Sequence, residues 1–135
     1  MTATYANMFF QKLTPSERIH LILFPEQAVV IKRSAENALR QSKLRFRGSG
    51  RNTASDAFRH CFWSALLARD IGYASALRYT NAHEAFAGNP PAEKVMDLHN
   101  NAVGLRIGRL GGGDALLISK CISALRSGKL KIIQH

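Results

Sequence analysis

Three short segments in the middle of the chain combine side chains that could perform acid–base or metal chemistry. The first contains Asp56, Arg59 and His60, the second contains His83 and Glu84, and the third runs from Met96 to Gly104. Imidazoles and carboxylates bind divalent metal ions and also transfer protons. Their combination is typical of a hydrolytic site.

The first segment begins a stretch that is apolar on every side. From His60 to Ala68 the sequence reads HCFWSALLA, with no formally charged residue, and such a helix lies buried at the centre of a fold. Asp56 and His60 share a helix face because they are four residues apart, and Arg59 shares a neighbouring face with Trp63. Charged groups entering a core must be paired, hydrogen-bonded or bound to a ligand. This helix end is either the floor of a polar pocket or a structural ion pair beside a core histidine.

The third segment places Asp97, Asn100, Asn101 and Gly104 on one helix face. Two consecutive asparagines and a glycine lower helix propensity, which indicates a function for that face. A carboxylate with two carboxamides could hold a metal-bound water, a substrate phosphate or a histidine of another helix, and Gly104 would permit close approach. The alternative is an exposed polar face. His99 points towards the apolar side and is expected to be structural.

We expect the three segments to converge on neighbouring helices. The predicted metal ligands are His60, His83 and Asp97, for a divalent ion of the Zn²⁺ or Mn²⁺ type. The predicted catalytic residues are Arg59, Glu84, Asp97 and Asn101. The predicted substrate-binding residues are Asp56, Trp63, Asn100 and Gly104. In this arrangement Glu84 or Asp97 accepts a proton from metal-bound water, and Arg59 stabilises developing negative charge.

Helical signals run along the whole chain and predict a single all-α domain, residues 1–135, of five or six helices with a short C-terminal tail. Thr14-Pro15-Ser16-Glu17 is a capping box, and its helix should end near Phe24. Pro25 should open a second helix, and further helices should start near 53–55, at Tyr73, at Pro91 and after a cap at Asp114. The motif-bearing core spans about residues 52–104.

The charge distribution points to an anionic partner. The net charge is +10, and two basic flanks enclose a nearly neutral middle. Such a field attracts nucleic acid, an anionic surface or a phosphorylated substrate. A non-enzymatic nucleic-acid binder would use the flanking basic residues Arg45, Arg47, Arg51, Arg106, Arg109, Lys129 and Lys131.

Other sequence features narrow the possibilities. No apolar run is long enough to span a membrane, and the N-terminal residues do not resemble a Sec signal peptide. We therefore expect a cytoplasmic protein, or one exported by a dedicated secretion system. Cys61 and Cys121 both lie in apolar helical patterns and are expected to be buried reduced thiols, with a disulfide as the alternative.

The segments DAFRHCFWSALLARDIG, NAHE and MDLHNNAVG resemble an uncharacterised bacterial domain family. That family occurs in small stand-alone proteins and in C-terminal modules of toxin-type proteins. The resemblance implies a bacterial effector with a possible immunity protein, and a site at the polar residues of the three segments. The order His60, His83-Glu84, Asp97 is also similar to the ligand order of HD-type phosphohydrolases, with Glu in place of their Asp. Together these features predict a metal-assisted hydrolase of phosphate-bearing substrates, with the nucleic-acid binder as the alternative.

Overall fold

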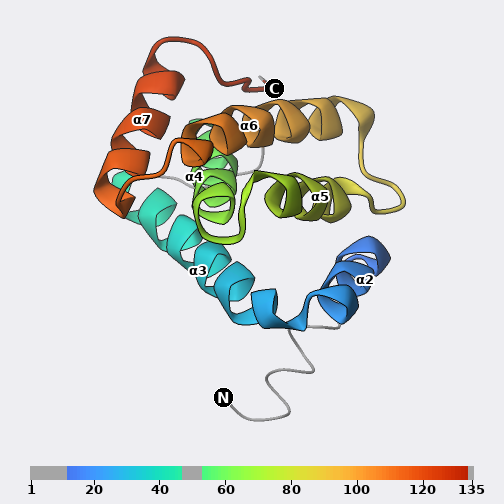
Figure 1. Cartoon of the computed structure of the whole chain (residues 1–135). Helices are drawn as coiled ribbons and strands as arrows, with labels where there is room; N and C mark the ends of the chain where they lie inside the picture. Colours follow the sequence, from blue (N-terminus) through green and yellow to red (C-terminus); the bar gives the residue numbers. More distant parts are fainter. Residues whose placement is uncertain (1–11, 47–52, 134–135) are drawn as a thin grey trace.

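Helix α4, from Ala54 to Ile71, is the central element of the fold. In the computed structural model, which describes residues 12–46 and 53–133, this helix packs against α3, α5, α6 and α7 (Figure 1). Nearly every residue from Ser55 to Ala68 is buried, as its uniformly apolar sequence predicts. Thr53 caps its first turn by accepting a hydrogen bond from the backbone N–H of Asp56, and Gly72 ends the helix with a φ of 88°.

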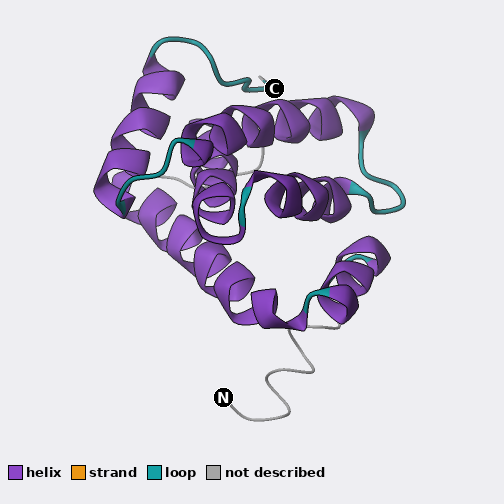
Figure 2. Cartoon of the chain, viewed as in Figure 1, coloured by secondary structure: helices purple, strands orange, loops and turns teal. Residues whose placement is uncertain are grey.

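The remaining helices surround α4. They are α2 (Pro15–Leu23), the short 3₁₀ helix η1 (Pro25–Gln27), α3 (Ala28–Arg45), α5 (Tyr73–Glu84), α6 (Pro91–Arg109) and α7 (Asp114–Arg126). The prediction of a single all-α domain is confirmed, and the described ranges contain no strand (Figure 2). Within those same ranges, no helix has both the length and the apolar character needed to cross a membrane.

Local signals located the helix ends well, with two corrections. The capping box at Thr14 and Glu17 is present. Pro25, however, opens a 3₁₀ turn, and α3 begins only at Ala28. Asp114 is not the cap of α7: Gly113 occupies that position, and the Asp114 carboxylate accepts a hydrogen bond from Arg69 at 2.6 Å. Because Asp114 is the first residue of α7 and its carboxylate binds Arg69 of α4, this side chain does not cap α7.

Helices α4 and α6 cross in close contact because α6 has glycines at the crossing. A Cβ atom on Gly104 would lie 2.0 Å from the carbonyl oxygen of Cys61, and one on Gly108 would lie 2.0 Å from that of Ala65. No side chain fits at such distances. The expected role of Gly104 in permitting close approach is therefore confirmed, with the backbone of α4 as its neighbour.

Two further contacts hold the periphery of this core. Cys61 and Cys121 are buried free thiols, as predicted, and their sulfur atoms are 3.2 Å apart between α4 and α7. The tail after α7 lies along α6, where Asn100 donates to the carbonyl of Lys131 at 2.9 Å and accepts from its N–H at 2.8 Å. His99 bonds to the carbonyl of Lys129, which confirms its structural role.

We expect Gly104→Ala to lower the free energy of unfolding by about 3 kcal/mol, because the added methyl group would force α6 away from α4. The matched control is Gly113→Ala. Gly113 has a φ of −74° and no atom within 4 Å of a built Cβ, so this change should cost less than about 1 kcal/mol. Urea unfolding followed by circular dichroism measures both. Equal stability of the two variants would contradict the tight crossing.

Candidate functional site

The first and third sequence segments meet where α6 packs on α4. His60 Nε2 lies 3.3 Å from Asp56 Oδ1 on its own helix and 3.4 Å from Asp97 Oδ1 on α6. Single ligand atoms of Asp56, His60 and Asp97 all lie within 4.8 Å of one another. These three residues form what we call the carboxylate–imidazole cluster. The i, i+4 spacing in α4 creates its first pair, and the α4–α6 crossing supplies its third member.

The spacing of the cluster suits a metal ion. Two ligand atoms at about 2.1 Å from a tetrahedral metal are about 3.4 Å apart, and the two N–O separations of the cluster are close to that value. Asp97 Oδ1 is buried and makes no hydrogen bond. A buried carboxylate oxygen without a donor is costly, and a cation would satisfy it. Three protein ligands leave a further coordination position for water or substrate.

The electrostatics of the cluster also favour a cation. Asp56 and Glu84 are buried beside the half-buried Asp97, and Arg59 donates to Asp56 Oδ1 at 2.8 Å. Burial raises the pKa of Asp97 to about 6, and the neighbouring carboxylates of Glu84 and Asp56 add to the increase. His60 and Arg59 oppose it without cancelling it. Because burial is the largest cause of this increase, a cation bound beside Asp97 would stabilise the ionised carboxylate.

Glu84 and Asn101 form a support behind His60. Asn101 donates through Nδ2 to Glu84 Oε2 at 3.0 Å and accepts from the Ser64 hydroxyl at 3.1 Å. The same Glu84 oxygen lies 3.8 Å from His60 Nδ1, the ring nitrogen on the side away from the two aspartates. All of these partners are buried. His60 Nδ1 makes no hydrogen bond, so Glu84 acts on this ring as a nearby charge while Nε2 faces Asp56 and Asp97.

His83 belongs to a second polar group that joins α5 to α2. Its Nδ1 lies 3.1 Å from Glu17 Oε1, and the Tyr79 hydroxyl donates to Glu17 Oε2. The backbone N–H of Thr14 also donates to Glu17, whose side chain is only 3% exposed. We call Glu17, Tyr79 and His83 the glutamate–histidine group. Among the residues that the structure describes, the group with the spacing of metal ligands is Asp56, His60 and Asp97, and His83, which the sequence predicted as a ligand, lies outside it.

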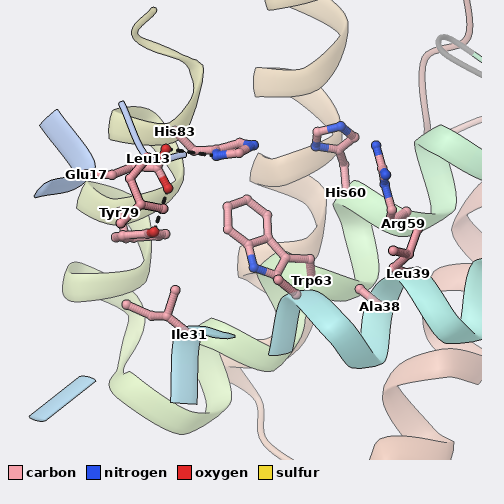
Figure 3. A pocket seen from close by; sticks show the side chains of 11 residues that line it. Leu13, Glu17, Ile31, Ala38, Leu39, Arg59, His60, Trp63, Tyr79 and His83 are labelled. Atoms are coloured by element: carbon pink, nitrogen blue, oxygen red, sulfur yellow. Dashed lines mark hydrogen bonds and ion pairs between the residues drawn. The ribbon is translucent and has the colours of Figure 1, made fainter. Parts of the chain in front are cut away.

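The charge state of the glutamate–histidine group follows from its contacts. Burial would raise the pKa of Glu17, but hydrogen bonds from His83, Tyr79 and Thr14 outweigh it and hold that pKa below its usual value. Burial would lower the pKa of His83, but Glu17 outweighs it and the pKa is raised. An ionised Glu17 can only accept, so His83 Nδ1 carries the proton. The opposite ring nitrogen points across the opening towards His60 (Figure 3).

A cleft of about 280 Å³ lies between the two polar groups. Figure 3 shows the Trp63 ring below His60 and His83, with Arg59 beyond His60. The rings of Trp63 and His83 are 5.0 Å apart and steeply inclined. Of the predicted substrate-binding residues, only Trp63 lines this cleft. Asp56 belongs to the cluster, Asn100 binds the tail and Gly104 contacts the backbone of Cys61.

Glu17 and Tyr79 were not among the residues singled out from the sequence. The capping box explained the presence of Glu17, and it does use Oε1 to accept from Thr14. The same oxygen also binds His83, a partner 66 residues away. Apolar periodicity in α2 did not point to Glu17, because Ile19, Ile22 and Leu23 are exposed while Glu17 is buried.

The fold and the site together define an all-α domain with a carboxylate–imidazole cluster at its central helix crossing. Residues 18–129 match the family described as a domain of unknown function (DUF6973), and the chain belongs to this family. The resemblance to an uncharacterised domain family is thereby confirmed. No solved structure is significantly similar to the chain.

The glutamate–histidine group predicts a pH-dependent stability. His83 has a raised pKa, so its contribution is complete below about pH 6.5 and is lost as the pH rises through that raised value. Glu17 has a lowered pKa, so its contribution is complete above about pH 4.5 and is lost as the pH falls through the lowered value. The stability difference between the protein and Glu17→Gln should therefore be largest between about pH 4.5 and 6.5. Urea unfolding from pH 4 to 9 measures it, and a difference that does not change with pH would contradict the ion pair.

Proposed function

We propose that the protein is a metal-assisted hydrolase of anionic, phosphate-bearing substrates. The observation that carries this proposal is the convergence of Asp56, His60 and Asp97, with a buried oxygen of Asp97 that has no donor. An imidazole with two carboxylates suits ions of the Zn²⁺ or Mn²⁺ class. A metal bound there would supply a water of lowered pKa as the nucleophile.

The other residues around the cleft have roles that complement the metal. Arg59 lies at the cleft with 41% of its side chain exposed, where it can bind an anionic group of the substrate. His83, oriented by Glu17, presents its second ring nitrogen towards the same opening and can accept or donate a proton. Asn101 holds the Glu84 carboxylate 3.8 Å from His60 Nδ1, where its charge favours a protonated Nδ1 and leaves Nε2 to bind the metal. This proposal gives His83 the proton-transfer role that the sequence suggested for Glu84 or Asp97.

Metal binding provides the first test. We expect one Zn²⁺ or Mn²⁺ per chain by elemental analysis, and a loss of affinity of at least about tenfold in His60→Gln and in Asp97→Asn, since each removes one ligand. The matched control is His99→Gln, which removes a histidine that binds only the tail backbone at Lys129. Circular dichroism verifies the fold of each variant. A wild-type protein that binds neither ion, or equal binding by all four proteins, would overturn the proposed centre.

The role of His83 is tested separately. We expect His83→Gln to retain the metal and to lose turnover of a phosphodiester such as bis(p-nitrophenyl) phosphate by about 10²–10⁴-fold, the usual contribution of a general acid or base. Elemental analysis and an absorbance assay measure the two properties on the same sample. Loss of the metal in this variant would instead support the assignment of His83 as a ligand.

The alternative function is nucleic-acid binding, which the net charge of +10 favours. Arg47 and Arg51 lie outside the described residues, whereas Arg45, Arg106, Lys129 and Lys131 are exposed. Arg109 lies over the Tyr73 ring, with its guanidinium carbon 4.7 Å from the centroid. A binder would show steep salt dependence that is insensitive to Asp97→Asn, whereas the hydrolase depends on that carboxylate.

We also propose that the protein acts as a bacterial effector with a cognate immunity protein and a dedicated export route. The support is the resemblance of the three motif segments to modules of toxin-type proteins. A basic phosphohydrolase would be harmful to a cell containing many anionic phosphate esters. Such a protein requires a specific inhibitor wherever it is made.

A further inference from the structure

The cleft beside the carboxylate–imidazole cluster has an apolar part and a polar end. One wall comes from α3 and the segment before α2, and it is aliphatic. The opposite wall is formed by α4 and α5. The apolar lining residues are Leu13, Ile31, Ala35, Ala38, Leu39 and Trp63. The polar end is formed by Arg59, His60 and His83 (Figure 3).

The apolar part of the cleft is larger than the chemistry of the cluster requires. A volume of about 280 Å³ corresponds to about nine water-sized groups, far more than a phosphate group and a nucleophilic water occupy. Ala35 and Leu39 are exposed, and the cleft thereby presents apolar surface on a face of α3. Apolar surface next to a polar site is typical of ligand pockets, where it binds the non-reacting part of the ligand.

The polar groups in the apolar part are few, and this limits the ligand. The Tyr79 hydroxyl donates to Glu17. The indole N–H of Trp63 is buried without an acceptor, on the side of the ring that faces α3 (Figure 3). A nucleobase presents several donors and acceptors along its edge, and this wall would leave most of them unpaired. An alkyl chain has none, so it adds no unpaired polar group of its own to those already in the wall.

The phosphate group of a ligand would bind at the polar end of the cleft. Arg59 donates to Asp56, and two-fifths of its side chain remains exposed at the mouth of the cleft. His60 lines the cleft with the same ring whose Nε2 faces the two aspartates. A phosphate bound beside Arg59 would therefore lie at the cluster while its substituent extended along Trp63 towards Ile31.

We propose that the substrate is a single-chain anionic amphiphile, with its phosphate at Arg59 and His60 and its alkyl chain in the cleft between α3 and Trp63. This inference rests on the proposed hydrolase function and specifies its substrate class. The cleft volume, less about three water-sized groups for the phosphate and the nucleophilic water, limits the buried chain to about six carbons. A soluble single-chain molecule fits this space, whereas a two-chain bilayer lipid does not.

The test is a titration with alkyl phosphates from methyl to dodecyl phosphate. The chain contains one tryptophan, so fluorescence reports directly on Trp63 in the cleft wall. We expect the affinity to increase by about two- to fourfold per methylene and to level off near six carbons, where the apolar part of the cleft is filled. An octyl phosphate that binds no tighter than methyl phosphate would overturn the inference. So would binding to phosphatidic acid vesicles without binding of octyl phosphate.

Two variants test the binding of the alkyl chain and of the phosphate group separately. Ala35→Phe places a ring in the cleft from an exposed position, and it should abolish the dependence on chain length while methyl phosphate still binds. The matched control, Ala74→Phe, adds the same ring at an exposed position on α5 outside the cleft and should retain that dependence. Arg59→Gln should weaken every alkyl phosphate by a similar factor. If the affinity of Ala35→Phe still depended on the length of the alkyl chain, that alkyl chain would bind elsewhere and the inference would be overturned.

The same samples distinguish this inference from the proposed function. Metal content and phosphodiester turnover are measured on wild type and on Ala35→Phe, which changes no residue of the cluster. Metal and turnover without any chain-length dependence would overturn the amphiphile and leave the hydrolase standing. Chain-length dependence without metal or turnover would overturn the hydrolase and support the cleft as the binding site of an anionic amphiphile.

Discussion

The close approach of α6 to α4 is the constraint on which the rest of the structure depends. It exists because Gly104 and Gly108 have no side chain where the two backbones meet. With a methyl group at either position the helices would separate, and Asp97 would move away from His60. The same crossing brings Asn101 within reach of both Ser64 and Glu84. The packing of two helix backbones at glycines therefore determines the geometry of the polar cluster.

A second constraint is that buried carboxylates need hydrogen-bond donors or cations inside the fold. The fold buries Glu17 and Glu84 almost completely, each at 2% exposure, together with Asp56. Glu17 is compensated within the chain by Thr14, Tyr79 and His83. The carboxylates around His60 are compensated less fully, as the raised pKa of Asp97 and its unpartnered oxygen both show. This contrast between two groups in one domain makes the first a positioning device and the second a candidate ligand site.

Much of this arrangement could be predicted from local patterns. The spacing of Asp56 and His60 predicted a shared face, and the structure places them in contact. The glycine at position 104 predicted a close helix neighbour, which is α4. The capping box and the proline and glycine breaks located most helix ends, because these signals act within a few residues. Contacts between residues far apart in the sequence could not be predicted in this way. Periodicity shows that His83 and Asn100 have defined faces, but not that one meets Glu17 and the other the backbone of Lys131.

The contacts just outside the family match bear on how a fragment of this domain should be cut. The family match begins at Arg18 and ends at Lys129. Glu17, which orients His83, lies one residue before the first limit, and Lys131, which binds Asn100, lies two residues after the second. A fragment cut at the limits of the family would leave the His83 imidazole without its carboxylate partner and the Asn100 carboxamide without its backbone partner. A fragment should therefore extend beyond the matched residues on both sides, at least to Leu13, which lines the cleft, and to Lys131.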